Sequence, residues 1–200
     1  MSSLEGLIQR KDPETLRSQF GVLRRQIHQF METEEETRLK ENPKPTEEEI
    51  YMAAFKEWLE PQVRDAIALM YRKGYASQSS GFHGTKFEVQ QIDGLFTVDE
   101  STRAALNLMG VEVLRGADIG APNNKLVTIL RFRAKDPSIA KMKEQWDAIA
   151  AALPKKQLPS GIQPICDRVE IFREEYAPDH ASLEATRDKY IQYLRTVTVP

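Results

Sequence analysis

The chain contains a single cysteine, Cys166, among its 200 residues. One thiol excludes an intrachain disulfide and any zinc site built from several cysteines. The three histidines (His28, His83 and His180) lie far apart and form no HExxH spacing. The sequence therefore predicts no metal site, and no motif in it identifies a cofactor or a catalytic residue.

The chain also lacks a strong charge imbalance and a long apolar run. Its formal net charge of −2 gives no general support for nucleic-acid binding, although a local basic patch is compatible with it. No segment is apolar enough to span a bilayer, and the N-terminal stretch MSSLEGLIQRKDPE has no apolar signal-peptide core. Together with the free thiol, these features lead us to expect a cytoplasmic protein with no membrane partner.

Helical periodicity is the main feature of residues 1–74. Asp12-Pro13 is a helix start, and the apolar residues that follow at steps of four and three are Leu16, Phe20, Leu23, Ile27 and Phe30. Thr46 and Glu49 form a capping box that starts a second amphipathic helix, which Pro61 should kink or divide. We predict that the two helices form an antiparallel hairpin within one chain.

After Gly74 the periodicity changes from helical to alternating. The expected strands are Lys86–Ile92, Val111–Arg115, Leu126–Arg133 and Ile165–Phe172, preceded by Tyr75–Phe82 as a polar edge strand or ordered loop. Helices should start at Asp99, Asp136-Pro137 and Pro178-Asp179. This order predicts an α+β protein, with a helical hairpin (1–74) packed on a ferredoxin-like βαββαβ antiparallel sheet with a C-terminal helix (75–200).

The strand Leu126–Arg133 separates apolar from cationic side chains. Leu130 and Phe132 should be buried against the helix that carries Met142 and Trp146, which leaves the two arginines on the open face of the sheet. If Phe87 and Val89 also face the helices, the polar residues of their strand share that open face. The expected binding residues, including a serine-rich edge, are His83, Lys86, Gln90, Arg131, Arg133, Ser79 and Ser80.

Three cations beside a histidine can hold a phosphate or carboxylate group. The alternative is that Arg131 and Arg133 are structural and pair with Glu88, with Glu170 or with acidic residues of the N-terminal helices. Both arrangements satisfy the charges. The sequence leaves this choice open.

Two catalytic patterns are also suggested by the residues. The serines near His83 lack the GxSxG turn of a serine nucleophile. His83-Gly-Thr85 and His180-Ala-Ser182 resemble the paired H-x-T/S motifs of the 2H phosphoesterase superfamily, in which two histidines act as general acid and base. Val127 stands where that family's strand would carry its histidine, and His180 falls at a helix start, so the sequence does not predict membership.

Acidic residues gather in the N-terminal helices, and their runs are similar to the carboxylate sites of all-helical nucleotide pyrophosphatases. They are Glu32–Glu36, Glu47–Glu49, Glu57 and Glu60. Most of them lie opposite the apolar seam or in a first helical turn, where a carboxylate favours the helix dipole. We interpret them as a solvated surface.

These observations support three functional hypotheses. The first is a protein that binds a partner protein or a small anionic ligand through the open sheet face. The second is a phosphodiester or nucleotide hydrolase that uses His83 with Lys86, Arg131 and Arg133. The third is a structural or assembly protein that uses the helical hairpin.

Overall fold

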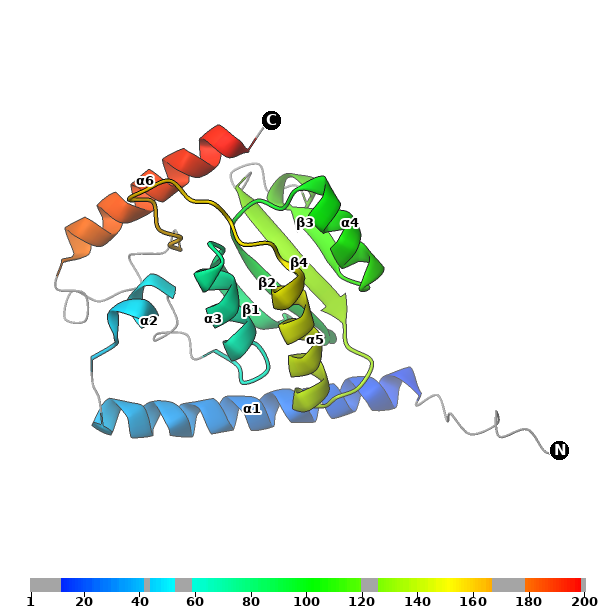
Figure 1. Cartoon of the computed structure of the whole chain (residues 1–200). Coiled ribbons are helices and arrows are strands. Elements are labelled where there is room, and N and C mark those ends of the chain that lie inside the picture. Colours follow the sequence, from blue (N-terminus) through cyan, green and yellow to red (C-terminus); the bar gives the residue numbers. More distant parts are fainter. Residues whose placement is uncertain (1–11, 42–43, 53–58, 120–125, 167–178, 199–200) are drawn as a thin grey trace.

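The computed structural model describes residues 12–41, 44–52, 59–119, 126–166 and 179–198 of the chain. It is a mixed α+β structure whose described strands form one antiparallel sheet in the order β1-β2-β4-β3. The described elements are α1 (Pro13–Glu41), α2 (Glu47–Met52), α3 (Arg64–Arg72), β1 (Ala76–His83), β2 (Lys86–Leu95), α4 (Glu100–Leu108), β3 (Glu112–Arg115), η1 (Gly116–Ile119), β4 (Val127–Arg133), α5 (Ile139–Ala152) and α6 (His180–Val197). Figure 1 shows α3 and α5 on one face of the sheet, with α1 and α6 near its opposite ends.

Most helix starts follow the capping residues in the sequence. Asp12 accepts a backbone hydrogen bond at the start of α1, and Thr46 and Glu49 exchange the reciprocal bonds of a capping box at the start of α2. The prediction for α5 is shifted by two residues. Its N-cap is Ser138 and not Asp136, because the Ser138 hydroxyl accepts the free backbone N–H of the first turn.

The predicted alternation of β4 is confirmed. Leu130 and Phe132 are almost fully buried, and the Phe132 ring lies 4.9 Å from that of Trp146 on α5. Because successive residues of a strand point to opposite faces, Arg131 and Arg133 lie on the face away from α5. Arg131 and Arg133 therefore lie on the predicted face of the sheet.

The predicted facing of β2 is wrong. Gln90 pairs with Phe132 and Val89 with Arg133, so Gln90 lies on the helix-covered face and Val89 on the other. Gln90 is fully buried, and its side-chain oxygen accepts a hydrogen bond of 3.1 Å from the amide of Gln62. The prediction assumed that apolar side chains mark the buried face, but a hydrogen-bonded amide also takes a buried position.

The ferredoxin-like order of strands is not confirmed. The expected neighbours β2 with β4 and β4 with β3 are present, but β1 occupies the position beside β2 that the fourth strand of a ferredoxin-like unit would take. Ile165 and Cys166 belong to no strand and pack in the core near α6. The rest of the predicted fourth strand, 167–172, lies outside the described residues.

The N-terminal hairpin is not confirmed either. Pro61 does divide the second helical region, since residues 59–63 are not helical and α3 begins at Arg64. Helix α1 packs instead against β2 and the core of the sheet domain, to which it contributes Phe20 and, packed against its edge, Leu23. Phe30, the last residue of the predicted seam, is half exposed.

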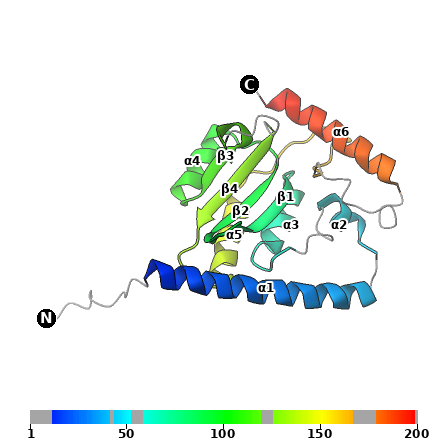
Figure 2. The ribbon, with the colours of Figure 1, turned by 180° about the vertical axis from the view of Figure 1, so that it is seen from behind.

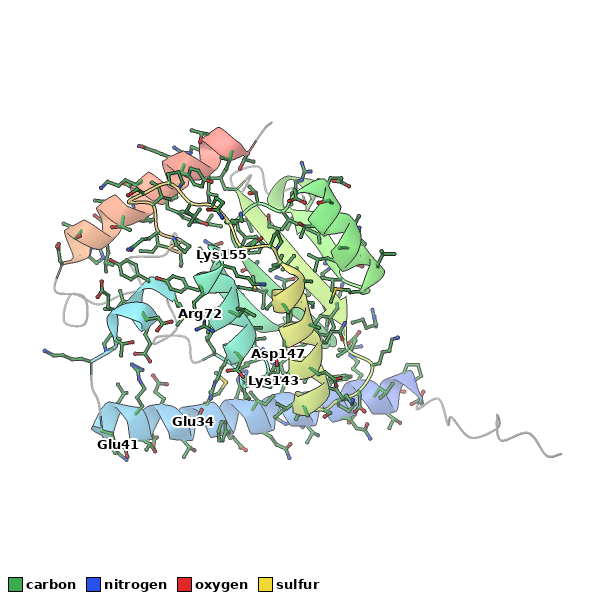
Figure 3. All side chains as sticks on the ribbon, in the orientation of Figure 1. Glu34, Glu41, Arg72, Lys143, Asp147 and Lys155 are labelled. Carbon is green, nitrogen blue, oxygen red and sulfur yellow. The ribbon has the colours of Figure 1, made fainter. Side chains whose placement is uncertain are left out.

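Helices α3 and α5 are joined by two lysines. Lys73, which caps the C-terminus of α3, donates hydrogen bonds to three backbone oxygens at the end of α5, at 2.6 to 2.8 Å. Such a cation satisfies carbonyls that a helix end leaves free. Lys143 lies with Asp147 on α5 (Figure 3) and bonds both Asp147, at 2.7 Å, and Asp65 of α3, at 2.6 Å.

The other face of the sheet is partly open. Helix α6 covers the end where β2 stops and β4 starts, and the Tyr190 hydroxyl donates to the Leu95 carbonyl at 2.6 Å. Figure 2 shows this face, with no described helix lying over the half that carries Arg131 and Arg133. No helix among the described residues is long and apolar enough to cross a membrane.

The outer edge of β3 is occupied by side chains. Arg103 of α4 donates to the Val113 carbonyl at 2.6 Å, and Asp118 of η1 accepts the Arg115 backbone N–H at 2.9 Å. Arg103 and Asp118 also lie 3.8 Å apart as an ion pair. Side chains thus bind two of the backbone groups through which this edge could pair with another chain.

The packing of α1 on the sheet predicts a clear difference between two of its residues. Phe20 is 1% exposed, so Phe20→Ala should lower the free energy of unfolding by about 3–5 kcal/mol. Val22, on the same helix, is 42% exposed, and Val22→Ala should change it by less than about 0.5 kcal/mol. Chemical denaturation measures both, and equal effects would contradict the docking of α1 described above.

Candidate functional site

A cavity of about 210 Å³ lies where the β1–β2 turn meets the end of β4. The residues that line it are His83, Lys86, Val89, Gly110, Glu112, Arg131, Phe132 and Arg133. Four of the seven predicted binding residues therefore share one hollow, which is called the cationic cavity below. They come from three strands, so the register of the sheet brings them together.

Both arginines of the cationic cavity have a carboxylate partner. Arg133 bonds Glu88 at 2.9 Å, as the structural alternative expected, and Arg131 bonds Glu112 on the neighbouring strand β3. Neither His83 nor Lys86 has an ion-pair partner among the described residues. Lys86 is exposed, and no described carboxylate pairs with its positive charge.

The other predicted site residues do not reach this cavity. Gln90 faces the helices, and Ser80 pairs with Ile92 on that same face. Ser79 pairs with Asp93, toward the end of the sheet that α6 covers. The serine-rich edge is therefore not part of the site. His180 begins α6 at the other end of the sheet, 3.9 Å from Glu184, so the structure does not bring the two histidine motifs together (Figure 1).

A second group of polar side chains surrounds Glu60, for which we predicted a position on a solvated surface. That interpretation is wrong, because Glu60 is only 8% exposed. Its carboxylate accepts a 2.6 Å hydrogen bond from Gln62, and Gln62 also donates to Gln90. The Gln62 oxygen and the Gln90 nitrogen are buried without a hydrogen-bond partner among the described residues.

Burial raises the pKa of Glu60 to about 7. The hydrogen bond from Gln62, the positive charge of Arg24 and the backbone N–H of Phe82 oppose that rise and leave it incomplete. His28 of α1 lies 3.7 Å from the carboxylate. Glu60 is therefore a titrating group at neutral pH that lies between α1 and the edge of β1.

Gly81 of β1 makes room for this carboxylate. A Cβ atom at position 81 would collide with Glu60 Oε2, and the backbone there has a φ of +105°, which only glycine adopts readily. The sequence signal was a glycine inside a strand, which marks a close approach of another group. A glycine does not say which group approaches, so Glu60 was missed.

Another cavity, of about 350 Å³, lies between the start of α4 and the end of α6. Thr97 lines it and accepts a 3.1 Å hydrogen bond from Lys156. Burial lowers the pKa of Lys156 to about 8, and its ammonium lies 4.6 Å from the centre of the Tyr75 ring. Lys156 does not line the cavity, and its contacts with the ring and hydroxyl are those of a packed side chain.

Among the residues that the structure describes, no three histidine, cysteine, aspartate or glutamate side chains are close enough to hold a metal ion. Comparison of the chain with protein-family models, curated proteins and solved structures finds no match in any of the three. The functional argument therefore depends on the geometry of the cavities and on their charges.

The buried Glu60 predicts an unusual dependence of stability on pH. A carboxyl whose folded-state pKa is raised stabilises the protein below its unfolded value of 4.5, and this stability is lost as the pH rises through about 7. The loss should amount to about 3 kcal/mol. Glu60→Gln should abolish that slope in the free energy of unfolding between pH 4.5 and 7.5.

Glu36→Gln, at an exposed position of α1, is the matched control for the titration of Glu60 and should keep the wild-type slope. Urea denaturation at a series of pH values measures all three proteins. A wild-type curve that is flat, or that rises with pH over this interval, would show that Glu60 is not held in a buried site.

The fit of Glu60 against Gly81 is testable with two glycines of one hairpin. Gly81→Ala should cost about 3 kcal/mol or more, because the new methyl group displaces the carboxylate and strains the backbone. Gly84→Ala, in the β1–β2 turn, should cost only about 1–2 kcal/mol, since φ is +52° and nothing lies within 4 Å of the added Cβ. Equal losses in thermal denaturation would contradict the close contact.

Proposed function

We propose that the protein binds a small anionic group, a phosphate or a carboxylate, in the cationic cavity. The observation that carries the proposal is that Lys86, Arg131, Arg133 and His83 line a single hollow on the open half of the sheet. Guanidinium and ammonium groups form charge-assisted hydrogen bonds with oxyanions, which are about twice as strong as neutral ones. This supports the anionic ligand of our first hypothesis over a partner protein.

The size of the cationic cavity favours a small group. Its volume of about 210 Å³ is below the roughly 300–1,000 Å³ that is typical of pockets for drug-sized ligands. Glu88 and Glu112 hold the two arginines in place when no ligand is bound, and an oxyanion would share the guanidinium donors with them. We therefore expect weak binding that depends strongly on Lys86, whose charge no described carboxylate offsets.

The same residues could serve a phosphodiester or nucleotide hydrolase, our second hypothesis. Hydrolysis of that kind uses a general acid and a general base within reach of the reacting group. His83 is the one histidine that lines this cavity, and both nearby carboxylates are engaged by arginines. We therefore favour binding over hydrolysis. The third hypothesis, assembly through a hairpin, gains no support from the described helices, because the hairpin is not confirmed.

Titration of inorganic phosphate into the protein, followed by calorimetry or amide NMR shifts, tests the proposal. Lys86→Ala should weaken binding roughly tenfold, about 1.4 kcal/mol, because it removes the unpaired cation. Lys189→Ala is the matched control, since Lys189 is exposed on α6 far from the cationic cavity and the change removes the same charge. The proposal fails if phosphate does not bind, or if both variants bind it equally.

A further inference from the structure

Arg133 lines more than one cavity. Arg133 also lines a larger cavity of about 670 Å³ between the start of α1 and the end of β4. The lining residues of this α1 cavity are Pro13, Glu14, Leu16, Arg17, Phe20, Glu88, Arg133, Ala134 and Lys135. The two hollows share Arg133, whose guanidinium also bonds Glu88 of the α1 cavity.

The walls of the two cavities differ in chemistry. Four side chains of the α1 cavity are apolar, and Leu16, which belongs to the apolar seam of α1, is only partly buried. Its charged residues are two glutamates, two arginines and one lysine, so the carboxylates are balanced and one positive charge remains. The α1 cavity therefore offers apolar surface, and no excess of negative charge, on its side of Arg133.

The backbone next to Arg133 is already hydrogen-bonded. The Ala134 N–H donates to the Glu88 carbonyl at 2.7 Å, and β4 lies between two strands of the sheet. A peptide laid along this surface would find no strand edge there to pair with. An aliphatic chain needs no hydrogen bonds and removes apolar wall from water.

We propose that the ligand of the cationic cavity is an anion with a short aliphatic chain, whose chain lies in the α1 cavity against Leu16, Phe20 and Ala134. This inference rests on the anion binding proposed above and names the class of ligand: an alkyl phosphate or a short fatty acid. The head group binds Lys86 and the arginines, and α1 provides the wall that selects the chain.

Comparison of hexyl phosphate with inorganic phosphate tests this inference. Each methylene removed from water should raise the affinity about fourfold, so hexyl phosphate should bind at least tenfold more tightly. Leu16→Ser should abolish most of that gain and leave the affinity for inorganic phosphate unchanged. Leu16→Trp, which fills the cavity with an apolar ring, should do the same and tests the inference even if the serine variant is unstable.

Met109→Ser is the matched control for the position of the chain. Met109 lines a different hollow, of about 500 Å³ between α4 and α5, which also reaches Arg133. The inference is overturned if hexyl phosphate binds no more tightly than inorganic phosphate, or if Met109→Ser and not the Leu16 variants removes the gain. In both cases binding of inorganic phosphate would still support the anion site, whereas no binding of either probe would refute both proposals.

Discussion

A carboxylate buried at the edge of the sheet constrains much of this structure. Glu60 can lie there because Gly81 has no side chain, and it receives hydrogen bonds from Gln62 and from the backbone of Phe82. Gln62 in turn donates a hydrogen bond to Gln90, which lies on the helix-covered face of β2. Burying a carboxylate costs free energy unless the group is hydrogen-bonded or protonated. Glu60 accepts hydrogen bonds, and burial raises its pKa to about 7, so hydrogen bonding and protonation both reduce that cost near neutral pH.

The sequence predicted what depends on local chemistry and on regular alternation. Helix α1, its Asp12 cap, the capping box at Thr46, and the burial of Leu130 beside an exposed Arg133 all follow from a few neighbouring residues. On β2, by contrast, the buried Gln90 bonds Gln62, which is 28 residues away in the chain. The ferredoxin-like order likewise required a choice between two candidate neighbours for β2, and no local pattern in the chain decides it.

The candidate site shows the same division. Alternation on β4 was enough to place both arginines on the open face, and the β1–β2 turn brought His83 and Lys86 to them. The sequence could not show which of these cations are paired with a carboxylate. Glu112 lies on the neighbouring strand β3, and the alternation of β4 gives no information about residues on another strand. Its bond to Arg131 makes the surface far less positive than the residue types suggest.

Side chains bind backbone groups at both edges of the sheet. Arg103 and Asp118 occupy backbone groups of β3 at one edge, and Glu60 occupies the Phe82 N–H of β1 at the other. Exposed strand edges are the usual starting points for domain swapping and for amyloid-like stacking, and side chains bound to those edges oppose both. A second strand that approached either edge would therefore have to compete with these side chains for backbone groups already bound.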